Sequence, residues 1–197
     1  MNARALPSPL DAATAIESRV TCLPIESLPL TQCVGGVLRE NVYGERDQPP
    51  FDRVSMDGIA VDSAELRAGV KQFRLAGVQA AGAAQLQRGR AGDAIEVMTG
   101  AILPRGCDCV IPVEQIELRD GAAHLTRAVK NAPYTNVHRR GSDSRQGALL
   151  LEAGTLLRPP EVAVAASAGM ARVRVSSQPA IMVISTGDEL VEPGEPI

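Results

Sequence analysis

Apolar and polar positions near the N-terminus follow a helical spacing. Four apolar residues recur every three or four positions and share one helix face: Ala13, Ile16, Val20 and Leu23. Ser8 supplies a hydroxyl that can cap the first turn, and Pro9 suits the first helical position. The pattern predicts a helix over residues 8–21. We then expect a brief extended segment at 28–33 and a short helix at 37–42.

The pattern changes to short runs of branched residues after the Gln48-Pro49-Pro50-Phe51 string, whose prolines favour extended backbone. These runs are separated by Gly, Asp or Pro, as in a small all-β unit. The predicted strands cover residues 58–62, 72–76, 94–98, 109–113, 116–118 and 124–129. Asp120-Gly121 is a strong hairpin signal. A β-barrel or sandwich is therefore expected from about residue 50 to 138.

Helical and extended patterns alternate in the last fifty residues. A turn at Ala153-Gly154 separates two short apolar runs, and Pro159-Pro160-Glu161 opens a helix that ends near Gly169. An alternating strand is predicted at 171–175. The run at 180–184 is apolar at every position, as in a strand buried on both faces of a parallel α/β sheet.

That last strand would need neighbouring strands and crossover helices to cover it, and few residues follow it. We therefore expect the chain to end just inside a further α/β domain that it does not contain. A fragment of a longer protein is the favoured interpretation, and a naturally short protein is the alternative.

Composition and charge narrow the classes of partner. The 197 residues are 45% hydrophobic but only 2% aromatic, and the formal net charge is −3. No basic run or basic face is present, which argues against nucleic acid and anionic membranes as partners. No apolar stretch approaches the ~20 residues of a spanning helix, and the N-terminus lacks the pattern of a signal peptide. A soluble, cytoplasmic protein is expected.

The cysteines are interpreted as small buried apolar residues in a reducing compartment. They are Cys22, Cys33, Cys107 and Cys109. The one-residue gap between the last two differs from zinc-knuckle spacing, which argues against a structural zinc site.

Three segments carry candidate chemistry. Asp52, Ser55 and Asp57 lie at a turn within 51–61, and on the residues alone a structural turn is favoured over a site. Thr99 follows a predicted strand, in a Met-Thr-Gly-Ala turn whose N–H groups could face an oxyanion. The loop 138–147 gathers three arginines with Asp143, a pattern that suits an oxyanion and a solvated loop equally.

The fourth candidate is the string Ser-Thr-Gly-Asp-Glu-Leu at 185–190. Polar groups at the carboxyl end of a buried parallel strand lie where open α/β sheets bind ligands. Thr186 and Gly187 could shape a backbone nest, and Asp188 and Glu189 offer hard oxygen ligands for Mg²⁺. An acid pair at a helix N-terminus would look the same. No Walker loop, nucleophile elbow, dinucleotide fingerprint or zinc-protease helix is present in the sequence.

Five motifs taken in order resemble the MoeA family, the molybdopterin molybdenumtransferases of molybdenum-cofactor synthesis, to which the gephyrin E domain is related. They are PPFDRVSMDGIAV, VMTGAILPRGCDCVI, RRGSD, LLLEAGTLL and VISTGDELVEPG, at residues 49–61, 97–111, 139–143, 149–157 and 183–194. The likeness extends over the whole chain, and about half of the usual family chain would be missing.

The resemblance implies an α+β, mostly β, multidomain fold. A discontinuous, partly helical domain would comprise residues 1–48 and 139–178, and a small β-barrel-like domain at 49–138 would be inserted into it. Residues 179–197 would form the first strand and loop of a truncated Rossmann-like domain that is similar to MogA.

The resemblance also implies a reaction. Family enzymes insert molybdenum from molybdate into adenylylated molybdopterin with release of AMP, and a divalent cation such as Mg²⁺ takes part. Their site lies between the third domain of one subunit and the second domain of the other. A homodimer is therefore expected, with a MogA-like adenylyltransferase and other cofactor-synthesis proteins as possible partners.

Site residues follow from the motif positions. Asp57, Thr99 and Glu189 are expected to be catalytic, with Asp57, Glu189 and Asp188 handling metal or molybdate. Thr99 would orient an oxyanion or make a contact across subunits. The expected substrate-binding residues are Asp143, Arg139, Arg140 and Thr186, with Asp143 supporting the loop or the interface.

Three departures from the family pattern are visible. Ile59 replaces a common aromatic, His138 replaces an arginine, and Ser142 replaces a glutamate. They leave room for a paralogue with reduced activity. Two hypotheses therefore stand: the N-terminal part of the transferase, inactive alone, or a non-catalytic module that dimerises or assembles cofactor-synthesis proteins.

Overall fold

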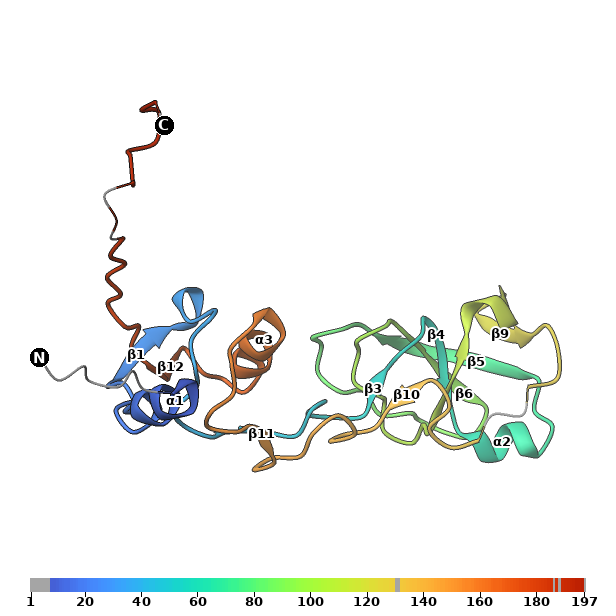
Figure 1. Ribbon diagram of the computed structural model, residues 1–197. Helices are drawn as coiled ribbons and strands as arrows, with labels where there is room; N and C mark the ends of the chain where they lie inside the picture. Colours follow the sequence, from blue (N-terminus) through green and yellow to red (C-terminus); the bar gives the residue numbers. More distant parts are fainter. Residues whose placement is uncertain (1–7, 130–131, 186, 188, 197) are drawn as a thin grey trace, which may run out of the picture. The chain divides into compact units, whose positions relative to one another are not determined.

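The computed structural model describes residues 8–129, 132–185, 187 and 189–196 (Figure 1). The chain divides into two compact units, Met1–Val42 with Leu151–Ile197, and Tyr43–Leu150. It passes from the first unit to the second through β2 (Val42–Tyr43) and returns through β11 (Leu149–Leu151), and these two strands pair. The expected boundaries at 48/49 and 138/139 fall inside the second unit. The assignment of 179–197 to a third domain stays a prediction.

The first unit pairs strands from the two ends of the chain. Strand β1 (Ile25–Pro29) runs antiparallel to β12 (Arg172–Ser176), with Ile25 opposite Ser176. A 3₁₀ turn (Leu30–Gln32) follows β1, and α3 (Pro159–Ser167) precedes β12. Its core includes residues that are almost fully buried: Cys33, Leu38, Leu157, Ala165, Val173 and Val175.

The N-terminal helix begins where the sequence predicts and ends earlier. Helix α1 spans Pro9–Glu17, and Ser8 and Asp11 form a reciprocal capping box that satisfies free N–H groups of the first turn. None of its residues is buried, and Leu10 and Ile16 are 75% and 65% exposed. With no packed face, the helix gains little from continuing to residue 21.

The second unit is built on a curled six-stranded sheet in the order β7-β4-β6-β5-β9-β8 (Figure 1). All neighbouring pairs are antiparallel except β5 with β6. The strands are β4 (Gly58–Val61), β5 (Gln72–Gln79), β6 (Asp93–Val97), β7 (Cys109–Pro112), β8 (Ile116–Arg119) and β9 (Ala122–Leu125). A separate ladder joins β3 (Arg53–Val54) to β10 (Val137–His138).

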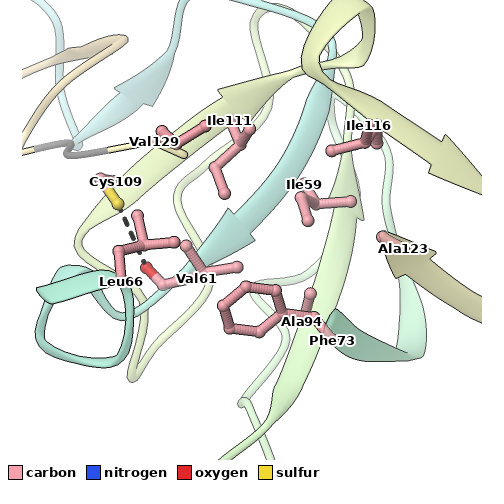
Figure 2. Packing of buried hydrophobic residues seen from close by; sticks show 10 residues of the cluster. All are labelled: Ile59, Val61, Leu66, Phe73, Ala94, Cys109, Ile111, Ile116, Ala123 and Val129. Carbon is pink, nitrogen blue, oxygen red and sulfur yellow. Dashed lines mark hydrogen bonds between the residues drawn. The ribbon is translucent and has the colours of Figure 1, made fainter. Parts of the chain in front are cut away.

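Both faces of the central strands are covered, which explains their continuous apolar runs. Successive side chains point to opposite faces of a strand. Ile59 and Val61 therefore join one buried cluster with Phe73 (Figure 2), while Ala60 joins a second cluster with Ile95. Phe73 is the only aromatic residue of these two clusters, in keeping with the 2% aromatic content.

Most predicted elements of this unit are confirmed. The β8–β9 hairpin turns at Asp120 and Gly121, whose φ angles of 51° and 74° are those of a type I′ turn. The strand expected at 124–129 is shifted to Ala122–Leu125, because its register is set by that hairpin. A short helix α2 (Ser63–Arg67), capped by Asp62, was not predicted, since five residues carry no clear period.

One expectation was wrong. Residues 37–42 form no helix, because Val37 and Leu38 make β-bridges to Leu156 and Val175. The run 180–184 forms no strand here, and Ile181, Met182, Val183 and Ile184 are 74–86% exposed, so its place in a further domain stays a prediction. A strand needs neighbours for its backbone hydrogen bonds, and among the described residues none pairs with this run.

Three of the four cysteines are buried, as expected. Cys33, Cys107 and Cys109 lie in the cores, and the Cys109 thiol lies 3.8 Å from the Val61 carbonyl oxygen (Figure 2). Cys22 is exposed, which contradicts the expectation for that residue. It precedes β1 in a segment, residues 13–27, whose side chains are all exposed.

Candidate functional site

Asp57 and Thr99 are brought together by the second unit. The backbone N–H of Thr99 donates to Asp57 Oδ1 at 2.6 Å, and its hydroxyl donates to the same oxygen at 2.7 Å. Both residues are exposed, at the ends of neighbouring strands β4 and β6. An acidic and a hydroxyl residue that are 42 positions apart in sequence therefore form one surface unit.

Two glycines shape the backbone at this pair. Gly58 follows Asp57 so close to the next strand that a Cβ would lie 1.9 Å from the Ile111 carbonyl oxygen. Gly100 has a φ of 88° and occupies the third position of a turn closed by a hydrogen bond from Ala101 N–H to the Met98 carbonyl. That positive φ suits glycine at the third position of such a turn.

The two hydrogen bonds set the charge state of Asp57. They lower the pKa of its carboxyl, the backbone bond from Thr99 first and the hydroxyl bond second. Hydrogen bonds to a carboxylate favour its ionised form. Because both end on Oδ1, Thr99 leaves Oδ2 unused, and Asp57 presents an ionised hard oxygen donor at the surface.

A metal site can be tested against the donors that are described. Among these residues, no three His, Cys, Asp or Glu side chains lie close enough together to hold an ion. Mg²⁺ commonly binds one or two carboxylates together with substrate phosphates and waters. The single ionised carboxylate of Asp57 fits that mode.

The arginine loop is held by two acids, Asp47 and Asp52, that lie far from it in the sequence. Asp47 Oδ2 accepts from Arg140 Nε at 2.7 Å, and its Oδ1 accepts from the Gln146 N–H at 3.0 Å. Asp52 Oδ1 accepts from the Arg140 N–H at 2.8 Å. The bonds from Gln146 and then Arg140 lower the pKa of Asp47.

The remaining loop residues make weaker contacts. The Arg139 guanidinium lies 4.4 Å from the centre of the Tyr134 ring, a cation–π contact. Asp143 is exposed and accepts from the Ser142 hydroxyl at 3.2 Å. His138 Nδ1 lies 3.2 Å from Arg53 Nη2, so the residue that departs from the family pattern binds a neighbouring arginine. The loop is thus a structured turn whose charges are partly paired.

The C-terminal candidates are only partly covered by the structure. Thr186 and Asp188 lie outside the described residues. Glu189 is exposed and belongs to the first unit, whereas Asp57 and Thr99 belong to the second. Its place beside Asp57 therefore stays a prediction.

A cavity of about 340 Å³ near the arginine loop was not foreseen. Apolar and charged side chains mix in its lining, including Phe51, Asp52, Arg105 and Arg140. Only the chain fold brings the 50–52 and 102–107 segments together, so no sequence signal could have found it.

Comparison with known proteins assigns the chain to a family. Residues 8–169 match the family model described as the MoeA N-terminal region (domain I and II). The chain belongs to the MoeA family. Asp57 and Thr99 both lie inside the matched region of this MoeA sequence, whereas Glu189 lies beyond it.

Two relatives are named molybdopterin molybdenumtransferase. The one from Synechocystis is 42% identical over 158 residues, which cover 80% of this chain and 40% of that protein. The one from Haemophilus influenzae is 35% identical over 173 residues, which cover 87% of this chain and 42% of that protein. The chain therefore spans less than half the length of these relatives.

A solved structure of the molybdopterin biosynthesis protein MoeA from Pyrococcus horikoshii is similar in fold. It shares 34% identity with a TM-score of 0.77 over 87% of this chain and 46% of that one. The mostly β architecture with few helices is accordingly MoeA-like. No helix among the described residues is long and apolar enough to cross a membrane.

Proposed function

We propose that this chain is the N-terminal part of a cytoplasmic molybdopterin molybdenumtransferase. The whole protein would insert molybdenum from molybdate into adenylylated molybdopterin and release AMP. Two relatives carry that enzyme's name, and the family model covers residues 8–169. The observation that supports a particular site is the Asp57–Thr99 pair. Two short hydrogen bonds join these residues, which come from two different family motifs.

In this proposal Asp57 is the charged group and Thr99 holds it. Both donors of Thr99, its N–H and its hydroxyl, are engaged with Asp57 Oδ1 and so are turned away from an oxyanion. We therefore assign Thr99 to the orientation of Asp57. Its hydroxyl oxygen still offers lone pairs to a donor on the substrate.

Asp57 would present Oδ2 to Mg²⁺, and Glu189 and Asp188 would complete the acidic set in the whole protein. When bound, the cation neutralises charge that develops on the phosphoanhydride oxygens. Arg139 and Thr186 would bind the anionic substrates, and Asp143 would support the loop or the interface. Since Arg140 is already paired with Asp47, it would act mainly by holding the loop.

The architecture would follow the family plan of a discontinuous first domain, an inserted β domain and a Rossmann-like third domain that begins near residue 179. A site shared between subunits requires a homodimer, and a MogA-like adenylyltransferase would supply the adenylylated substrate. The 197-residue chain alone should then lack turnover.

The test is molybdate-dependent AMP release by the full-length protein. Asp57→Asn keeps the size of the side chain and removes its charge, and it should lower turnover by about 100-fold or more. Asp120→Asn is the matched control, because Asp120 lies at an exposed hairpin tip where Asn tolerates the positive φ. Equal activity of the two variants would refute the role of Asp57, and AMP release by the 197-residue chain would refute its inactivity.

An assembly module is the second candidate, favoured by one observation. Helix α1 exposes Leu10 and Ile16, and none of its residues is buried against the described part of the chain. Such an apolar face suits a protein partner. Light scattering of the chain, with a pull-down of cofactor-synthesis proteins, tests this: a monomer that binds none of them would exclude the module.

A further inference from the structure

Gln79 is a fully buried polar side chain at the end of β5. In the sheet it lies opposite Val97, the last residue of β6 before the Thr99 turn. Its side-chain amide is satisfied by the loop that follows β5. Nε2 lies 3.3, 3.4 and 3.1 Å from the carbonyl oxygens of Ala80, Ala83 and Ala84, and Oε1 accepts from the Leu86 N–H at 2.7 Å.

These partners fix which way the amide points. With the oxygen and nitrogen exchanged, the NH₂ group would face the Leu86 N–H and the oxygen would face three carbonyls, so every contact would become repulsive. Only a side chain with an acceptor and a donor at this length can satisfy both sides. Gln79 therefore holds loop 80–86 through its own end group.

The loop held by Gln79 reaches the turn that carries Thr99. The methyl of Ala81 is the nearest atom to the position that a Cβ would occupy on Gly100, at 3.9 Å. The far end of the loop is bonded to the segment after the turn. Gln85 Nε2 donates to the Leu103 carbonyl at 2.7 Å, and the Arg105 N–H donates to the Leu86 carbonyl at 2.9 Å.

Thr99 thus lies between two anchored points. Before the turn, Val97 pairs with Gln79 itself, and after it, Leu103 is bonded to the loop that Gln79 holds. Because Asp57 and Thr99 are exposed, little packing of their own side chains restricts them. The rigidity of their hydrogen bonds has to come from the backbone of the turn.

We propose that Gln79 is a positioning residue for the Asp57–Thr99 pair, acting through loop 80–86 on the turn at Gly100. Its catalytic meaning rests on the proposed function, whereas the structural coupling between Gln79 and Thr99 does not. The alternative is that Gln79 only holds loop 80–86 and does not affect Thr99. The experiment has to distinguish these two roles.

Amide hydrogen exchange and amide proton shifts, measured by NMR on the 197-residue chain, test the coupling. Gln79→Met removes the hydrogen bonds at nearly constant length, and Gln72→Met on the same strand is the control, since Gln72 is exposed. The Thr99 amide should exchange at least about tenfold faster in Gln79→Met, as expected for loss of a local restraint worth one buried hydrogen bond. Its proton shift should also move upfield. Gln72→Met should change neither.

Two outcomes would overturn the proposal. One is faster exchange in loop 80–86 with Thr99 unchanged. If Gln79→Met unfolds the whole sheet, Ala81→Gly tests the coupling instead. It removes only the methyl group nearest Gly100 and leaves the hydrogen bonds of Gln79 in place. An unchanged Thr99 amide in Ala81→Gly would be the second refuting result, and faster exchange there supports the coupling.

A parallel assay separates this inference from the proposed function. In the full-length protein, Gln79→Met should lower the turnover of AMP release more than it raises KM, because it loosens a catalytic pair and leaves substrate contacts intact. If wild type releases no AMP while the Thr99 amide still responds, the proposed function fails and the coupling stands. If wild type releases AMP but the Thr99 amide does not change in Gln79→Met, the coupling fails and the proposed function stands.

Discussion

The α-carbon of Gly58 and the carbonyl oxygen of Ile111 approach so closely that no side chain fits between β4 and β7 at this position. A Cβ on Gly58 would lie 1.9 Å from that oxygen and 3.0 Å from the Pro112 carbonyl carbon, both of them backbone atoms. Backbone within a sheet cannot move aside as a flexible side chain can. The glycine that follows Asp57 is therefore a requirement of strand packing, whatever the role of the acid beside it.

Replacing Gly58 should be among the most damaging changes in the second unit. Gly58→Ala is expected to cost about 3 kcal/mol or more of unfolding free energy in urea denaturation, because two strands would have to separate. Gly121→Ala is the control: its φ is 74°, but no atom lies within 4 Å of the new Cβ. That change should cost only about 1 kcal/mol. Equal losses would show that conformation, and not contact, limits position 58.

The hydrogen bonds of Asp57 should make part of the stability depend on pH. They lower the pKa of Asp57 below its ordinary value of 3.8, so their contribution is present above that pH and is lost as pH falls through the folded value. Thr99→Val, which removes the hydroxyl bond, should destabilise the chain more at neutral pH than in acid. Urea unfolding across pH, with Thr126→Val as the control, measures this. A loss that does not vary with pH would contradict it.

The cysteines should differ sharply in reactivity. Burial raises the pKa of Cys107 and Cys109 to about 12, so at pH 8 only about one thiol in ten thousand is the reactive thiolate. Cys33 is buried as well, and burial raises its pKa. Iodoacetamide should therefore label Cys22 alone in the folded chain and all four thiols in urea, as mass spectrometry would show. Labelling of Cys109 as fast as Cys22 without denaturant would refute the burial.

The arginine loop should depend more on Asp47 than on Arg140. Asp47→Ala removes both the bond from Gln146 and the pair with Arg140, whereas Arg140→Met removes only the second. An exposed ion pair contributes little, so Arg140→Met should lower the unfolding free energy slightly and Asp47→Ala clearly more. Arg145→Met, an exposed arginine of the same loop, is the control. The opposite order would show that the charge pair, and not the backbone bond, holds the loop.

Elements with local signals were predictable. Ser8 and Pro9 mark the start of α1, Asp120-Gly121 marks the β8–β9 turn, and Pro159 marks the start of α3, because caps and turns depend on a few adjacent residues. Helix α2 was missed although Asp62 caps it, because five residues are too few to show a helical period. Residues 37–42 were assigned to a helix without any such signal. Apolar content alone cannot show which partners a run finds, and this is why the buried strand expected at 180–184 stays a prediction.

The sequence by itself determined the aliphatic core, most strands of the second unit and the motifs that belong to the MoeA family. It could not show that Thr99 directs both of its donors at Asp57 or that Asp47 holds Arg140. Nor could it show that the Gln79 side chain is hydrogen-bonded to the loop that reaches Gly100. Each of these contacts joins residues from separate segments, and strand register, which decides them, is settled only when the whole sheet packs. Caps and turns depend on adjacent residues and can be predicted from them, whereas the geometry of the site depends on the tertiary fold.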